Sequence, residues 1–290
     1  MLFWRVIVLA VVQGMAELLP VSSSAHVVVA EKLMGLDPSS PQMTLLLVML
    51  HTGTMLAVIL YFWKQWRHAF FASAARFKEF FILLILASAI TGVLGEALIK
   101  AIEKFGFRSS TKAEVEQLFS HLELIAPALA LAGVLILVSS VFEKRSALPS
   151  EPASGVGLNA GQAAWIGAVQ ALCLPFRGFS RSGATISTGM IVGVPKLRAE
   201  EFSFALAVVV TPPAISREVL RLAKAEHLSG GLDLGAAMVP GLFGAVCAFL
   251  AGLVALKWMS AWLERGRWYW FGIYCLFAAA IVAALHYRGF

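Results

Sequence analysis

The sequence predicts an all-α polytopic membrane protein, built as an inverted-topology repeat with two re-entrant helical hairpins and about six transmembrane helices. Hydrophobic residues make up 59% of the 290 residues, charged residues only 14%, and the mean hydropathy is +0.82. A typical soluble domain carries about 25% charged residues. Apolar stretches near the bilayer-crossing length of about 20 residues recur along the whole chain. Two further apolar stretches are interrupted by proline and polar residues at matching places.

Six stretches are long and apolar enough to span a membrane as helices. They are 42–63, 80–101, 122–142, 202–222, 234–256 and 268–287. Lys and Arg in the loops 64–78 and 257–267 favour the cytoplasmic side for those loops, which places both termini outside. The net charge of +6 at pH 7 is explained by such loop residues, and no nucleic-acid partner is expected.

The interrupted stretches are 5–34 and 161–195. Each flanking half has only about 10–15 residues, too short to cross a bilayer as a helix. We therefore expect two re-entrant hairpins. Irregular backbone at membrane depth is tolerated only where it is buried in protein or lines a cavity. The two breaks therefore predict a functional site.

The two halves of the chain correspond to each other. Val12-Gln13 recurs as Val169-Gln170, and Ser23 recurs as Ser180 at the same separation. Each interrupted stretch is followed by three spans, and because three is odd the second half must run inverted through the membrane. We expect a first repeat at 1–145, a connector at 146–160 and a second repeat at 161–290.

The first break carries a carboxylate in an apolar stretch. Glu17 and Gln13 are four residues apart and share one helix face. A carboxylate inside a membrane segment is costly and is a functional-site hypothesis by default. A structural carboxylate paired with a neighbouring donor is the alternative.

Hydroxyl groups and an imidazole follow this carboxylate. Ser22, Ser23 and Ser24 lie where the second half-helix should begin, and a helix N-terminus binds anions. His26 lies about one turn later and is suited to general acid–base chemistry. The alternatives are helix capping for the serines and a hydrogen-bonding role for the histidine.

The second break supplies a cation. Arg181 is flanked by Ser180 and Ser182, with Thr185 one turn later. The guanidinium fork matches phosphate oxygens, whereas a snorkelling arginine is the usual alternative near a helix end. For Arg177, contact with the site and solvation at the loop edge both stay open.

Together the two breaks fit phosphoryl hydrolysis on a membrane-embedded lipid phosphate. A lipid-phosphate transporter or flippase using the same pocket is the rival function, because inverted repeats with broken helices are usual in carriers.

The motifs at the two breaks resemble those of a known protein family. Gln13-x-x-x-Glu17 followed by Leu-Pro-Val-Ser-Ser-Ser-Ala-His26, and Gly178-Phe-Ser-Arg-Ser-Gly-Ala-Thr185, resemble motifs of the undecaprenyl-diphosphate phosphatase (bacitracin-resistance) family. The resemblance covers essentially the whole chain. Arg177 stands where the family pattern has proline.

The resemblance implies hydrolysis of undecaprenyl diphosphate to undecaprenyl phosphate and inorganic phosphate, which recycles the lipid carrier for cell-wall synthesis. It implies a multi-pass protein of the bacterial inner membrane whose site opens to the periplasmic face. It also implies a divalent cation, Mg²⁺ or Ca²⁺, and leaves a homodimer open.

Carried over residue by residue, the resemblance assigns three kinds of role. The catalytic residues would be Glu17, Ser23, His26 and Arg181, and the metal ligands Glu17 and Gln13. The substrate-binding residues would be Gln13, Ser22, Ser24, Gly178, Ser180, Ser182 and Thr185. Whether Ser23 or an activated water attacks the phosphorus stays open.

Two further groups of residues stand out. His51, Thr52 and Thr54 interrupt the first full span, and a structural hydrogen-bonding role is favoured over a place in the pocket. The tryptophans near the start of the last span are typical of an interfacial aromatic belt; they are Trp258, Trp262, Trp268 and Trp270.

Overall fold

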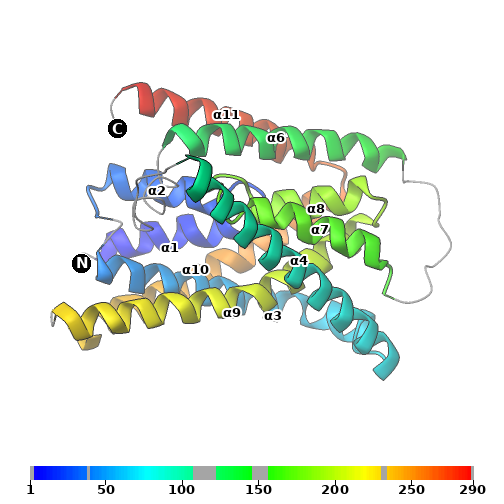
Figure 1. Ribbon diagram of the computed structural model, residues 1–290, viewed down its shortest axis with the longest axis horizontal. Helices are drawn as coiled ribbons and strands as arrows, with labels where there is room; N and C mark the ends of the chain where they lie inside the picture. Colours follow the sequence, from blue (N-terminus) through cyan, green and yellow to red (C-terminus); the bar gives the residue numbers. More distant parts are fainter. Residues whose placement is uncertain (1–2, 38–39, 107–121, 146–155, 230–233, 289–290) are drawn as a thin grey trace.

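The computed structural model describes residues 3–37, 40–106, 122–145, 156–229 and 234–288, and these contain helices and no strand (Figure 1). The helices are α1 (Phe3–Leu18), α2 (Ser23–Leu33), α3 (Pro41–Ala69), α4 (Ala74–Gly106), α6 (Leu122–Arg145), α7 (Ala160–Leu172), α8 (Arg181–Ile191), α9 (Lys196–Ser229), α10 (Leu234–Glu264) and α11 (Tyr269–Tyr287). The predicted all-α class is confirmed.

Within these described ranges, six helices are long and apolar enough to cross a membrane. The qualifying segments are Pro41–Ala69, Ala74–Ile102, Glu123–Phe142, Lys196–Leu220, Met238–Glu264 and Tyr269–Tyr287. They lie in α3, α4, α6, α9, α10 and α11, in the order that the sequence predicts. The helices extend past several of the predicted span ends because helix formation continues into polar flanks that hydropathy excludes.

Each interrupted stretch forms a pair of short helices joined by a turn. α1 and α2 have 16 and 11 residues, and α7 and α8 have 13 and 11. None of the four reaches the length of about 20 residues needed to cross a bilayer. The breaks therefore lie where the sequence predicts them.

The expected connector at 146–160 is described only in part, because residues 146–155 lie outside the described residues. Its end is well defined. Asn159 and Gln162 form a capping box, in which each side chain accepts a hydrogen bond from the other residue's backbone N–H at 2.9 Å. This reciprocal cap fixes the start of α7.

Long helices enclose the two short-helix pairs. α1 packs on α10 and α3, while α7 packs on α4, and α8 packs on α6 and α9. α6 and α11 lie side by side along one edge, and both termini lie at the same end of the molecule (Figure 1). Residues 182–190 of α8 are all buried, so this helix lies in the interior.

Small residues allow the closest helix contacts. A Cβ on Gly133 of α6 would lie 2.9 Å from the carbonyl oxygen of Gly272 on α11, and the reverse contact is also 2.9 Å. A Cβ on Gly14 of α1 would lie 2.6 Å from the carbonyl oxygen of Ala248 on α10. Such close backbone approach is the usual device for packing helices in membranes, where no hydrophobic driving force acts between them.

Candidate active site

The turn between α1 and α2 begins where proline interrupts the helix. Pro20 has no backbone N–H to continue the ladder, so α1 ends at Leu18. Ser22 caps α2 with a φ of 68°, a left-handed conformation that costs a non-glycine residue free energy. Its Oγ accepts from the backbone N–H of Ala25 at 3.5 Å and lies 3.2 Å from Ser24 Oγ.

The turn between α7 and α8 uses glycine instead. Gly178 has a φ of 101°, and a Cβ there would lie 2.6 Å from the carbonyl oxygen of Ile125. Only glycine fits both requirements. Ser180 then caps α8 by accepting from the backbone N–H of Gly183 at 3.3 Å.

The two turns contact each other near the centre of the molecule. The backbone N–H of Gly178 donates to Ser24 Oγ at 3.1 Å, and Ser182 Oγ donates to the carbonyl oxygen of Leu19 at 3.3 Å. In Figure 1 the α1–α2 pair and the α7–α8 pair extend to opposite ends from this contact. Residues more than 150 positions apart in sequence thereby meet at one candidate site.

An ion pair between Glu17 of α1 and Arg181 of α8 links the two pairs of short helices. Its Oε1 accepts from Arg181 Nη2 at 2.9 Å, and its Oε2 accepts from Ser23 Oγ at 2.5 Å and from Gln13 Nε2 at 3.2 Å. The side chains of Glu17 and Arg181 are 15% and 22% exposed. This is a largely desolvated ion pair, in which each partner compensates the burial cost of the other.

One nitrogen of the Arg181 guanidinium has no hydrogen-bond partner among the described residues. Its Nη1 is buried and makes no hydrogen bond to the described residues. An unpaired buried donor on a cation is costly, and an anionic ligand would satisfy it. Arg181 also begins α8, where the helix dipole favours negative charge. Both features fit a phosphate group.

His26 faces away from this cluster. Its Nδ1 lies 2.8 Å from the carbonyl oxygen of Ser22 and its Nε2 lies 2.7 Å from the hydroxyl of Tyr274 on α11. A carbonyl oxygen can only accept, so Nδ1 carries the proton, and in the neutral ring Nε2 accepts from the phenol. From the sequence we expected His26 to act as a catalytic residue together with Glu17, Ser23 and Arg181. The structure does not bring it to these residues, because its position on α2 turns it toward α11.

His51 takes the place near Glu17 instead. Its Nε2 lies 3.7 Å from Glu17 Oε2, and its Nδ1 donates to the carbonyl oxygen of Leu47 at 2.8 Å. A narrow recess is lined by His51, Thr54, Glu17 and Arg181, among others. From the sequence we expected a structural hydrogen-bonding role for His51. A polar residue in the first span, at the depth of the breaks, was the available signal.

The remaining predicted site residues lie around the two turns, with their side chains engaged. Thr185 Oγ1 donates to the carbonyl oxygen of Arg181 at 2.8 Å and lies 2.5 Å from Ser203 Oγ. Ser180 and Ser22 cap helices, while Ser24 and Ser182 join the turns. These hydroxyls surround the charged centre, which consists of the Glu17–Arg181 ion pair and of Ser23 bonded to Glu17.

The donor set fits a divalent cation only together with substrate oxygens. No group of three or more His, Cys, Asp or Glu side chains that could hold a metal occurs in the described part of the chain. Glu17 is the carboxylate at this centre, and both of its oxygens accept hydrogen bonds. Mg²⁺ is commonly held by one or two carboxylates plus substrate phosphates and water. A cation that arrives with a diphosphate is compatible with these residues.

Comparisons with known proteins point to one family. The family model described as bacitracin resistance protein BacA matches residues 6–281. The chain is 55% identical to undecaprenyl-diphosphatase 2 of Acinetobacter baylyi, covering 97% of each protein. It is 33% identical to undecaprenyl-diphosphatase 2 of Burkholderia ambifaria, covering 96% of this chain and 95% of that protein. It is 28% identical to the undecaprenyl-diphosphatase of Parabacteroides distasonis, covering 98% of each.

Proposed function

The chain belongs to the bacitracin resistance protein BacA family, and on that premise we propose which of its residues carry the reaction. The protein is a multi-pass membrane phosphatase that hydrolyses undecaprenyl diphosphate to undecaprenyl phosphate and inorganic phosphate. The observation that supports the residue assignment is the largely buried Glu17–Arg181 ion pair between the two turns, with Ser23 bonded to the same carboxylate.

Arg181 and the N-termini of α2 and α8 hold the diphosphate. The buried Nη1 supplies a charged donor that the protein itself leaves unsatisfied. The first turn of α2 contacts the turn that leads into α8, through Gly178 and Ser24, so the positive ends of both helix dipoles lie on the same side of the two pairs. Stabilising the charge spread over the transferring phosphoryl group is the main catalytic contribution.

Ser23 is the nucleophile in this proposal. Its Oγ already donates to Glu17 Oε2, so the carboxylate accepts the proton as Oγ bonds to the terminal phosphorus. The bond between that phosphorus and the bridging oxygen breaks, and undecaprenyl phosphate leaves. Water then hydrolyses the phosphoserine and releases inorganic phosphate. His26, expected from the sequence as the proton carrier, contacts Tyr274 instead and takes no step here.

A divalent cation, Mg²⁺ or Ca²⁺, would be held by the Glu17 carboxylate and the Gln13 amide oxygen together with phosphate oxygens. Such a cation neutralises the charge of the diphosphate. Arg181 remains the permanent cation of the site, whether or not the metal is bound.

Helix contacts support the inverted repeat as part of this proposal. The first helix of each short pair packs on the second long helix of the opposite half: α1 on α10, and α7 on α4. The third long helices, α6 and α11, pack on each other through the reciprocal Gly133–Gly272 contact. A two-fold axis that relates residues 1–145 to residues 161–290 would produce this pattern, in which each half packs on the corresponding helices of the other. The short pairs are then re-entrant hairpins in the bacterial inner membrane, and the site opens to the periplasmic face.

The test is phosphate release from undecaprenyl diphosphate by the purified protein in detergent, with and without a chelator. A phosphatase releases phosphate without a bilayer, and Glu17→Gln abolishes release because the base and the Arg181 bridge are both lost. Glu96→Gln is the matched control, since Glu96 forms an exposed ion pair with Lys100 on α4, outside the site. Release that is absent in detergent yet accompanied by lipid movement across vesicles would favour the transporter.

A further inference from the structure

The turn that leads into Ser23 contains a strained residue. Ser22 has a φ of 68° and a ψ of 99°, and within the described ranges it is the one non-glycine residue with a positive φ. A residue with a side chain stays in this conformation only where its surroundings hold it, and such strain is typical of functional sites. Ser23 is the next residue in the chain, so whatever holds Ser22 also sets the position of the Ser23 hydroxyl.

Side chains of α2 and α11 hold two carbonyl groups of this turn. His26 Nδ1 donates to the carbonyl oxygen of Ser22 at 2.8 Å, from one turn further along α2. The Cys275 thiol on α11 donates to the carbonyl oxygen of Pro20 at 3.3 Å. A thiol is a weak donor, so the imidazole makes the stronger of these two bonds, and it makes that bond to the strained residue itself.

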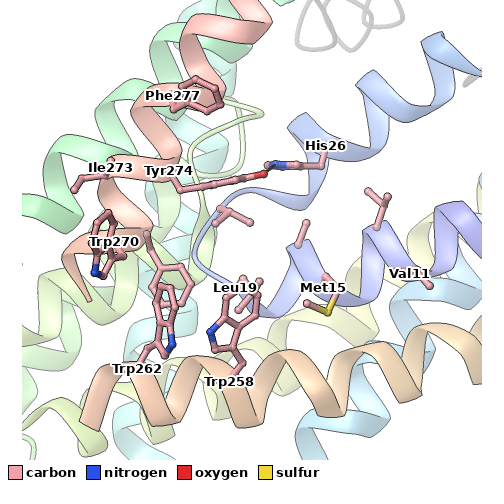
Figure 2. A pocket seen from close by; sticks show the side chains of 14 residues that line it. Val11, Met15, Leu19, His26, Trp258, Trp262, Trp270, Ile273, Tyr274 and Phe277 are labelled. Atoms are coloured by element: carbon pink, nitrogen blue, oxygen red, sulfur yellow. Dashed lines mark hydrogen bonds between the residues drawn. The ribbon is translucent and has the colours of Figure 1, made fainter. Parts of the chain in front are cut away.

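Tyr274 of α11 sets the form of the imidazole that makes this bond. Figure 2 shows the His26 and Tyr274 side chains pointing toward each other from α2 and α11, beside an apolar cavity that both residues line. His26 Nε2 and the phenol oxygen are 2.7 Å apart, and the two ring planes differ by 13°. Because the phenol donates to Nε2, the proton of the neutral ring stays on Nδ1, and a protonated ring carries that proton as well. His26 is therefore a donor to Ser22 in either charge state.

This chain of hydrogen bonds ends beside the reacting group. Tyr274 bonds to His26, and His26 bonds to the backbone of Ser22. The next residue, Ser23, donates through its Oγ to Glu17 Oε2 at 2.5 Å. Misplacing a reacting group by about 1 Å can lower a rate by about 100-fold. The imidazole thus acts on the nucleophile through the backbone of one residue.

We propose that His26 and Tyr274 are positioning residues, which hold Ser22 in its left-handed conformation and thereby aim the Ser23 hydroxyl at Glu17 and the terminal phosphorus. The inference rests on the proposed function and adds to it the residues that fix the nucleophile. His26 exchanges no proton with the substrate, and its contribution comes from the Nδ1–H group alone.

Two replacements of His26 separate the roles of the two ring nitrogens. The side-chain amide nitrogen of asparagine is as many bonds from the backbone as Nδ1, and that of glutamine is as many bonds away as Nε2. His26→Asn therefore keeps a donor for the Ser22 carbonyl oxygen, whereas His26→Gln does not. His68→Asn and His68→Gln are the matched controls, because His68 is exposed in the last turn of α3. The assay is steady-state phosphate release from undecaprenyl diphosphate by the purified full-length protein, with a thermal unfolding curve in the same detergent.

We expect His26→Gln to lower kcat about 30-fold and His26→Asn to lower it only about threefold. The larger loss combines a lost hydrogen bond with an unsupported left-handed residue, which together reduce the population of aligned turns by a factor of about this size. KM should stay within about twofold of wild type in both variants, because Arg181 is unchanged. The pH dependence of kcat should keep its wild-type shape in His26→Asn, since a positioning donor takes no part in proton transfer. Both His68 variants should match wild type.

Ser22→Gly tests the strain itself. Glycine adopts a φ of 68° about as readily as a negative φ, so the turn of this variant needs less support from His26. In the Ser22→Gly background, adding His26→Gln should lower kcat only about threefold, the loss expected from the hydrogen bond alone. Each kcat is taken per folded protein, so the comparison holds where the variants differ in folded yield.

Equal losses of kcat in His26→Asn and His26→Gln, or no loss in either, overturn the positioning role. A pH profile that changes shape in His26→Asn would make His26 a proton carrier and overturn that role as well. An equal loss from His26→Gln in the wild-type and Ser22→Gly backgrounds overturns the part assigned to the strain. In each of these cases wild-type release continues, so the phosphatase function stands, whereas wild-type protein that releases no phosphate overturns both proposals.

Discussion

The replacement Arg181→Lys tests the charged centre most directly. Arginine uses Nη2 to hold Glu17 at 2.9 Å and keeps a second, buried donor at Nη1. Lysine retains the positive charge but has one nitrogen on a flexible stem, so it cannot bind the carboxylate and a phosphate oxygen in the same fixed fork. The variant therefore preserves the ion pair and removes the donor that we assign to the phosphate.

The expected loss follows from that single donor. A hydrogen bond to a charged group contributes about 1.5–3 kcal/mol. Since the donor acts on charge that develops during phosphoryl transfer, kcat/KM should fall by roughly 10- to 150-fold, mainly through kcat. The assay is steady-state phosphate release from undecaprenyl diphosphate, accompanied by a thermal unfolding curve in the same detergent.

A matched pair elsewhere in the molecule provides the control. Arg198 donates to Glu201 Oε2 at 2.6 Å, within the same helix and away from the two turns. Arg198→Lys should leave kcat/KM within about twofold of wild type, since a partly exposed ion pair contributes little. Activity of Arg181→Lys within about threefold of wild type, with normal unfolding, would refute our assignment of Nη1 to the phosphate.

Three further replacements test other parts of the site. Ser23→Ala should lower kcat by at least about 1,000-fold with unchanged thermal stability, and labelled phosphate trapped on wild-type protein but not on the variant checks it; retained turnover would indicate attack by water. Gly178→Ala should destabilise the protein by about 1–3 kcal/mol, since φ is 101°, whereas Gly92→Ala, with open space and a helical backbone, should not. Tyr274→Phe should cost about 1 kcal/mol in the free energy of unfolding through its lost hydrogen bond, while Tyr287→Phe, 86% exposed, should be neutral; equal stability of each variant and its control would contradict these two predictions.

The hydropathy of the sequence was enough to predict the six long helices, and its proline and glycine residues were enough to predict the two breaks that give the four short helices. Both signals are local: a run of apolar residues must be buried or in lipid, and Pro20 removes a backbone donor wherever the chain goes. Motif chemistry likewise pointed to Glu17, Ser23 and Arg181 as candidate site residues, because a carboxylate or a guanidinium in an apolar segment needs a partner.

The sequence did not predict toward which neighbouring helix a polar side chain would point. Spacing along α2 placed His26 within one turn of Ser23, but only the packing of α11 turned its ring toward Tyr274. His51 came to Glu17 because α3 packs against α1, a contact between residues 34 positions apart that no periodicity encodes. Local sequence patterns show which polar side chains need a hydrogen-bond or ion-pair partner. The relative placement of the helices, which depends on close contacts such as that of Gly14 with Ala248, decides which residue becomes that partner.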